Sequence, residues 1–177
     1  MTETPSSTMP PPSTAVVWRS VGLVLRVLTV ISLVVSLIIL TTNTTTVSSN
    51  FGQIKIRFQD IKAYRYVLAT IVIGLVYGFL QTAFAIYHVT TGNRINGGDA
   101  LYFFDFYGDK LISYLLATGT GAGFGVSVDL KDANSGTVSG LDKFFNKGNA
   151  ASAILLFAFI FTAISSILSS LSLPKRA

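Results

Sequence analysis

The chain has 177 residues, of which 50% are hydrophobic and only 12% charged, and it carries a formal net charge of +5. Soluble domains average about 25% charged residues, so this composition is typical of a multi-pass membrane protein and excludes a disordered or collagen-like chain. Cysteine is absent, which excludes disulfides, cysteine-based zinc sites, thiol catalysis and S-palmitoylation. The scattered basic residues do not indicate nucleic-acid binding.

Four apolar blocks follow a short amino-terminal arm. Residues 1–17 are rich in Pro, Ser and Thr, and we expect them to be disordered. The blocks comprise residues 18–40, 67–89, 101–128 and 150–173. About 20 helical residues cross a hydrocarbon core of about 30 Å, so each block is long enough to span a bilayer. None has the alternation of barrel strands. The sequence therefore predicts an all-α, integral membrane four-helix bundle.

The linkers give two conflicting signals about orientation. Lys and Arg number seven in the linkers 41–66 and 127–149, against four on the side of the termini. The positive-inside rule applied to this count places the termini outside. Asn43 begins an N-glycosylation acceptor sequence, Asn-Thr-Thr, which is usable only on the lumenal face and places the termini inside. The residues alone leave the orientation undecided.

Two opposite charges lie inside apolar blocks. Arg26 is eight positions after Trp18, and Asp109 is eight positions after Leu101, so each is about 12 Å into its helix. The first and third helices enter from the same side, so the two charges lie at one level. A charge at depth costs about 2.5–3.5 kcal/mol on insertion scales. We therefore expect Arg26 and Asp109 to form an interhelical ion pair, directly or through water.

Other roles for these charges stay open at this point. Each side chain can snorkel to the near interface, which suits a long Arg better than a short Asp. A proton or ion path is also conceivable, but the chain has no inverted repeat to support transport. Asp105 is one turn nearer the surface and is expected at the interface. Lys110 either snorkels or competes with Arg26 for the carboxylate.

Small residues at a spacing of four indicate close helix packing. The second block contains Gly74 and Gly78, and the third contains Gly119, Gly121, Gly123 and Gly125. We expect these six glycines to pack helices within one bundle, with a share of them available for contacts between protomers. The serines of the fourth block are expected to bond to their own helix or across to another.

No catalytic constellation is present. The single histidine, His88, has no accompanying nucleophile or orienting acid. The loop acids Asp129, Asp132 and Asp142 are balanced by nearby lysines, which does not favour a metal site. The sequence therefore predicts a protein that is not an enzyme and that binds no cofactor, metal ion, nucleic acid or small-molecule substrate.

Several short motifs carry a resemblance to a known family. They are Val24–Leu28 around Arg26, Thr41–Asn43, Ala85–His88, Gly108–Leu111 and Tyr114–Ala117. As a set they resemble the CASP-like branch of the Casparian strip membrane domain protein family, plant four-span proteins related to the MARVEL proteins. The hallmark of that family is an arginine in the first helix and an aspartate in the third, which match Arg26 and Asp109.

The resemblance implies a multi-pass plasma-membrane protein with both termini, residues 1–17 and 174–177, in the cytoplasm. It also implies homo- and hetero-oligomers and a scaffold that organises a membrane domain, linked to cell-wall modification. The outer loops lack the family's Pro-Phe-Phe segment and its cysteines, so a general CASP-like scaffold is expected instead of a role in the Casparian strip itself. Two alternatives are a small transporter or channel subunit that uses Arg26 and Asp109, and a MARVEL-like membrane-traffic factor.

Overall fold

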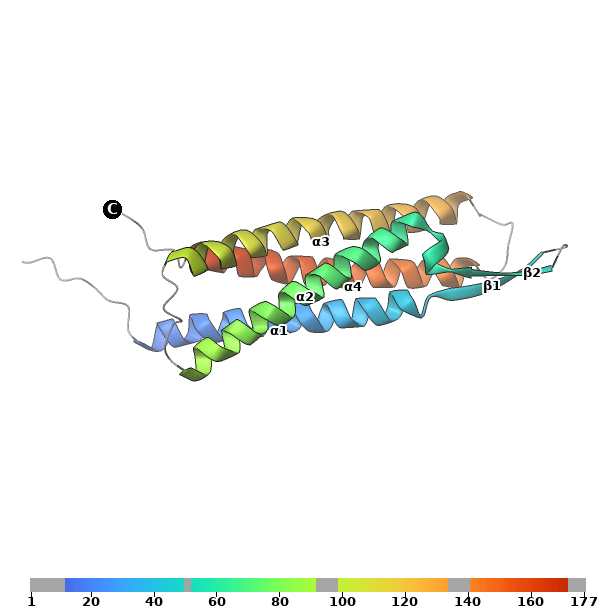
Figure 1. Ribbon diagram of the computed structural model, residues 1–177. Helices are drawn as coiled ribbons and strands as arrows, with labels where there is room; N and C mark the ends of the chain where they lie inside the picture. Colours follow the sequence, from blue (N-terminus) through green and yellow to red (C-terminus); the bar gives the residue numbers. More distant parts are fainter. Residues whose placement is uncertain (1–11, 50–51, 92–98, 134–140, 172–177) are drawn as a thin grey trace, which may run out of the picture.

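The protein is an elongated bundle of four helices with a β-hairpin at one end (Figure 1). The computed structural model describes residues 12–49, 52–91, 99–133 and 141–171. The helices are α1 (Pro12–Thr41), α2 (Lys62–Thr91), α3 (Asp99–Ala133) and α4 (Leu141–Leu171), and a 3-10 turn, η1 (Phe58–Asp60), precedes α2. All four helices are long and apolar enough to cross a membrane. The four-helix membrane bundle expected from the sequence is confirmed.

All four helices begin earlier than the sequence predicted, and α1 and α4 do so by the widest margins. α1 begins at Pro12, so residues 12–17, expected in the disordered arm, are helical. Proline suits a first helical turn because that turn leaves its backbone N–H groups unpaired in any case. α4 begins at Leu141, nine residues before the apolar block, with Asp142 in its first turn. An acidic side chain there complements the helix dipole, and a polar first turn is invisible to a search for apolar blocks.

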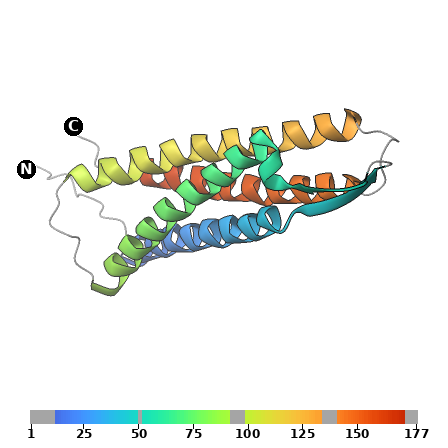
Figure 2. The same ribbon diagram turned by 45° about the vertical axis from the view of Figure 1, so that its right-hand side comes forward.

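The helices alternate in direction, so the start of α1 and the end of α4 lie at the same end of the bundle. α3 and α4 pack along their lengths, and α4 also packs against α1. α2 runs obliquely over the bundle, from the carboxyl-terminal part of α3 towards the amino-terminal part of α1 (Figures 1 and 2). This crossing brings the middle of α2 against both neighbours.

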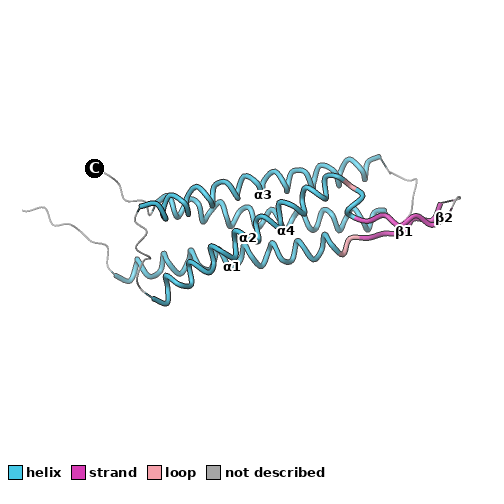
Figure 3. Tube along the Cα trace, in the orientation of Figure 1, coloured by secondary structure: helices cyan, strands magenta, loops and turns pink. Residues whose placement is uncertain are grey.

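A two-stranded hairpin, which the sequence analysis did not predict, continues the bundle beyond the end of α1. Strands β1 (Thr44–Ser49) and β2 (Gly52–Arg57) pair antiparallel, with Thr44 opposite Arg57 and Ser49 opposite Gly52. Figure 3 shows both strands projecting past the helices. The base of the hairpin is anchored to the bundle, because Ile56 packs against the core and the Phe58 N–H donates to the Asn43 carbonyl at 3.3 Å.

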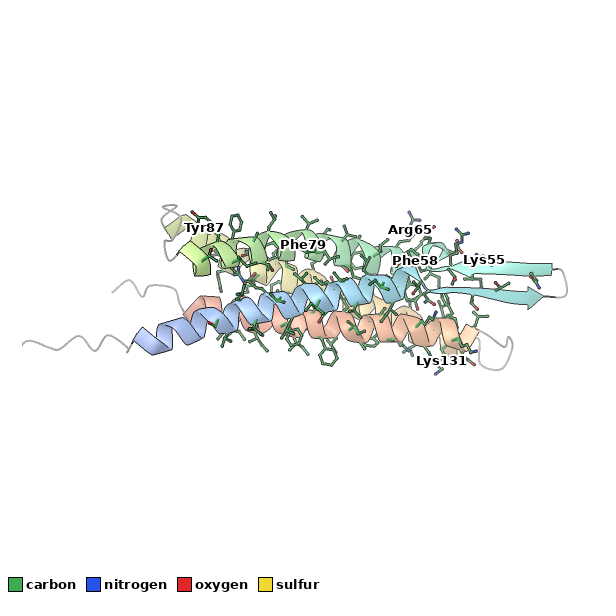
Figure 4. The ribbon with its side chains drawn as sticks, turned by 90° about the horizontal axis from the view of Figure 1, so that it is seen from below. Lys55, Phe58, Arg65, Phe79, Tyr87 and Lys131 are labelled. Carbon is green, nitrogen blue, oxygen red and sulfur yellow. The ribbon has the colours of Figure 1, made fainter. Side chains whose placement is uncertain are left out.

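Large apolar side chains lie both inside the bundle and on its surface. Leu33, Ile71, Leu116 and Leu155 are fully buried between the helices. Large apolar side chains such as Phe79 nevertheless point outward from α2 (Figure 4). Such an inside-and-outside apolar pattern is stable only where the solvent is lipid.

Candidate functional site

The structure places Arg26 of α1 and Asp109 of α3 next to each other. Arg26 Nη2 lies 3.7 Å from Asp109 Oδ2, and the two side chains are only 14% and 4% exposed. Both residues lie within the stretches of α1 and α3 that are long and apolar enough to cross a membrane.

Both oxygens of the Asp109 carboxylate accept hydrogen bonds. The Tyr77 hydroxyl donates to Oδ1 at 2.7 Å, and the Ser165 hydroxyl donates to Oδ2 at 3.2 Å. Hydrogen bonds to an ionised acceptor are stronger than neutral ones, and they offset much of the cost of removing a carboxylate from water. The carboxylate is therefore held in one position by side chains from three helices: Arg26, Tyr77 and Ser165.

The guanidinium of Arg26 is tied to α2 as well as to the carboxylate. Its Nη1 donates to the main-chain carbonyl of Gln81 at 3.1 Å and also to the Gln81 side-chain oxygen. The Gln81 amide in turn donates to the Tyr77 hydroxyl at 2.7 Å. The chain of contacts Arg26–Gln81–Tyr77–Asp109 thus closes into a ring. We call these four residues and Ser165 the charge cluster; it joins all four helices.

The charge cluster borders a cavity of only about 20 Å³, also lined by Thr29 and Thr162. This is about the space that one water molecule needs. The two threonine hydroxyls donate to carbonyls of their own helices, Leu25 and Ala158.

Lys110 does not compete for the carboxylate. Its side chain is exposed, and its ammonium lies 5.7 Å from the centre of the Phe106 ring. This placement agrees with the snorkelling alternative. The side chains of Asp105 and His88 lie outside the part of the structure that is described.

The six glycines divide into an inner and an outer set. A Cβ at Gly74 or Gly78 would press on Leu33 or Val30 of α1, and one at Gly119 or Gly123 would collide with side chains of α2 and α4. These four face the bundle interior. At Gly121 and Gly125 an added Cβ meets nothing within 4 Å, so these two do not pack helices within the bundle, contrary to the main expectation.

A seventh glycine, Gly108, supports the charge cluster directly. A Cβ at this position would collide with the ring of Tyr77. The absence of a side chain at Gly108 therefore lets Tyr77 lie against α3 and reach the neighbouring Asp109. Sequence reasoning treated Gly108 only as part of a family motif.

Tyr77 and Gln81 were also missed, although a signal for them exists. Gly74, Tyr77, Gly78 and Gln81 are spaced by three, one and three residues, which is the spacing of a single helix face. Two polar side chains on the glycine-bearing face of an apolar helix indicate a buried polar contact with a neighbouring helix.

Asn43, a possible glycosylation site in the sequence, has a structural role in the fold. It is fully buried at the junction of α1 and β1, and its Nδ2 donates to the Phe144 carbonyl of α4 at 3.0 Å. Glycosylation attaches the sugar to this nitrogen, so a glycan at Asn43 would have to displace this buried hydrogen bond. Its Oδ1 is buried without a hydrogen-bond partner.

Within the described residues, no three His, Cys, Asp or Glu side chains gather in a metal-binding arrangement. The cluster contains a carboxylate and two hydroxyls, but each hydroxyl donates its proton to the carboxylate. This arrangement holds charges in place and does not resemble a nucleophile with its base.

Comparison with known proteins identifies the family. Residues 15–161 match the Casparian strip membrane protein domain. CASP-like protein 4D1 of Ricinus communis is 50% identical, over 95% of this chain and 99% of the relative. CASP-like protein 4D2 of Arabidopsis thaliana is also 50% identical, over 94% and 98%. No solved structure matches the chain. Together with the four membrane-spanning helices, these matches mean that the chain belongs to the Casparian strip membrane protein family, among its CASP-like members.

Proposed function

We propose that the protein is a non-enzymatic scaffold of the plasma membrane that self-associates, also with related four-span proteins, and organises a membrane domain. Both termini lie in the cytoplasm, and the hairpin lies outside the cell. The support for a membrane scaffold is the family membership together with four helices that are long and apolar enough to cross a membrane.

The observation that carries the proposal is the closed charge cluster. Both terminal nitrogens of Arg26 and both oxygens of Asp109 have partners from other helices. A transport path needs charged groups that meet water and exchange partners. Here the same groups fix the positions of four helices. A buried ion pair whose two groups are also held by hydrogen bonds from other helices supports a structural role over a transport role.

The hairpin gives such a scaffold a surface outside the bilayer. It projects beyond the helices and carries the exposed residues Gln53, Lys55 and Arg57 (Figures 3 and 4). In the proposed orientation this surface faces the cell wall. A link to cell-wall modification therefore rests on the hairpin, whereas self-association can use the apolar helix faces within the bilayer.

Photobleaching of the fluorescently tagged protein in plant cells tests the proposal. A scaffold is expected to form surface patches that recover slowly, and two differently tagged copies should be captured together from those patches. Fast recovery and no capture would contradict it. Rapidly moving puncta would favour a membrane-traffic factor, as in MARVEL-like proteins. Flux through liposomes containing the purified protein, lost in Asp109→Asn, would favour a transporter.

A further inference from the structure

A groove of about 790 Å³ lies where the hairpin meets α2. One wall is the 3-10 turn η1, with Phe58 and Asp60. The other wall is one face of the first three turns of α2, with Arg65, Leu68 and Val72. The groove is separate from the charge cluster and shares no residue with it.

The groove has a charged end and an apolar end. Arg65 is exposed, and its guanidinium forms no salt bridge with any described carboxylate. Figure 4 shows Arg65 at the hairpin end of the bundle, near Phe58. Eight residues further along α2, Ile73 is 49% exposed and Val72 is 46% exposed. Eight helical residues span about 12 Å, which is several methylene lengths of an acyl chain.

The charged and apolar ends of the groove match the expected position of α2 in a membrane. The candidate membrane span of α2 begins with the helix itself, at Lys62, and we infer that Arg65, one turn further along, lies near the lipid headgroups. Leu68, Val72 and Ile73 lie deeper, at the level of acyl chains. Asp60 is the single carboxylate of the groove, and its Oδ2 already accepts the Arg57 N–H at 2.8 Å.

We propose that this groove binds one ordered glycerophospholipid, with its phosphate on Arg65 and one acyl chain along Leu68, Val72 and Ile73. A guanidinium is the preferred partner of a phosphate because its N–H groups match the phosphate oxygens. The buried ring of Phe58, 7% exposed, closes the groove beside the chain. The bound lipid joins the hairpin to α2 at the membrane surface. This lipid site does not depend on the scaffold function proposed above.

Native mass spectrometry of the purified full-length protein tests the site. Phosphatidylcholine, phosphatidylglycerol and diacylglycerol of the same chain length are added separately. We expect one bound phosphatidylcholine or phosphatidylglycerol per chain and at least threefold to fivefold lower retention of diacylglycerol, because the phosphate provides the polar contact. Equal retention of diacylglycerol would overturn the proposal.

Three variants locate the lipid. Arg65→Gln is expected to lower phospholipid retention about threefold to fivefold, the effect of losing an exposed ion pair, and Val72→Trp should lower it by filling the groove. Lys62→Gln is the matched control, because this exposed basic residue lies outside the groove. Thermal unfolding confirms that each variant is folded. Unchanged retention in folded Arg65→Gln, or an equal loss in Lys62→Gln, would contradict the assignment.

Discussion

At Asp109 the cost of a membrane-embedded charge is offset locally. Insertion of a single charged side chain costs about 2.5–3.5 kcal/mol. Two hydroxyls and a guanidinium surround this carboxylate, whereas an isolated ion would have only lipid around it. Removal of either Arg26 or Asp109 leaves the other charge uncompensated. A single substitution is therefore expected to destabilise the fold by more than the loss of the one contact between them.

Substitutions of Arg26 test this reasoning. Arg26→Ala strands the Asp109 carboxylate and is expected to destabilise the bundle by about 3–5 kcal/mol. Arg26→Lys should cost less, because it keeps the charge, but one ammonium cannot match the two-nitrogen contact with Gln81 and Asp109. Thermal unfolding in detergent and delivery to the cell surface measure both effects.

The double variant Arg26→Leu with Asp109→Leu removes both charges together. It is expected to fold and traffic better than either single leucine variant, because no unpaired ion remains in lipid. Worse delivery of the double variant than of both single variants would contradict the pairing.

Substitution of Gly108 tests how the ring of Tyr77 is positioned. Gly108→Ala pushes the ring of Tyr77 away from α3 and should weaken its hydrogen bond to Asp109, at a cost of about 1–3 kcal/mol for overpacking. Gly121→Ala is the control on the same helix, since an added Cβ there meets nothing within 4 Å. Thermal unfolding compares the two variants. Equal stability of both would show that Gly108 does not position Tyr77.

At the scale of elements, Asn43 connects the end of α1 to α4 and to the hairpin. Its side-chain amide donates to the Phe144 carbonyl, and its own carbonyl accepts the Phe58 N–H. Asn43→Ala is therefore expected to destabilise the protein by about 1 kcal/mol, because it removes the hydrogen bond that joins the end of α1 to the Phe144 carbonyl of α4.

The glycosylation alternative predicts a different result. Thr45→Val destroys the acceptor sequence Asn43-Thr44-Thr45 but keeps the Asn43 amide and a β-branched residue in β1. We expect this control to be more stable than Asn43→Ala, and the wild-type protein to keep its mass after treatment with a glycosidase. A mass loss in wild type that is absent in Thr45→Val would show that Asn43 carries a glycan.

At the scale of the whole molecule, the bilayer explains which features the sequence predicts. It requires long apolar helices, so four blocks were enough to predict four spans. The alternating direction of the helices was enough to predict that Arg26 and Asp109 lie at the same depth in the bundle. The contributions of Tyr77 and Gln81 depend on the rotation and oblique crossing of α2, which hydropathy does not encode. The hairpin was missed because two strands depend on contacts at their base and give only a weak pattern.

Orientation is also a property of the whole molecule, and it decides whether the hairpin can face the cell wall. Since the chain has no cysteine, single cysteines can be introduced without background. Gln53→Cys reports on the hairpin end, and Thr90→Cys reports on the opposite end; both positions are exposed. In the proposed orientation, a membrane-impermeant maleimide labels Gln53→Cys in intact cells and Thr90→Cys only after permeabilisation.

The opposite labelling pattern would agree with the positive-inside count, because the basic residues Lys55, Arg57, Lys62 and Arg65 would then be cytoplasmic. It would remove the outward-facing surface from the proposed scaffold while leaving the charge cluster unaffected. Labelling of both variants in detergent controls for accessibility of the two cysteines. In the proposed orientation, by contrast, the seven basic residues of the first and third linkers would lie outside the cell, against the positive-inside count, so the labelling experiment decides between the two arrangements.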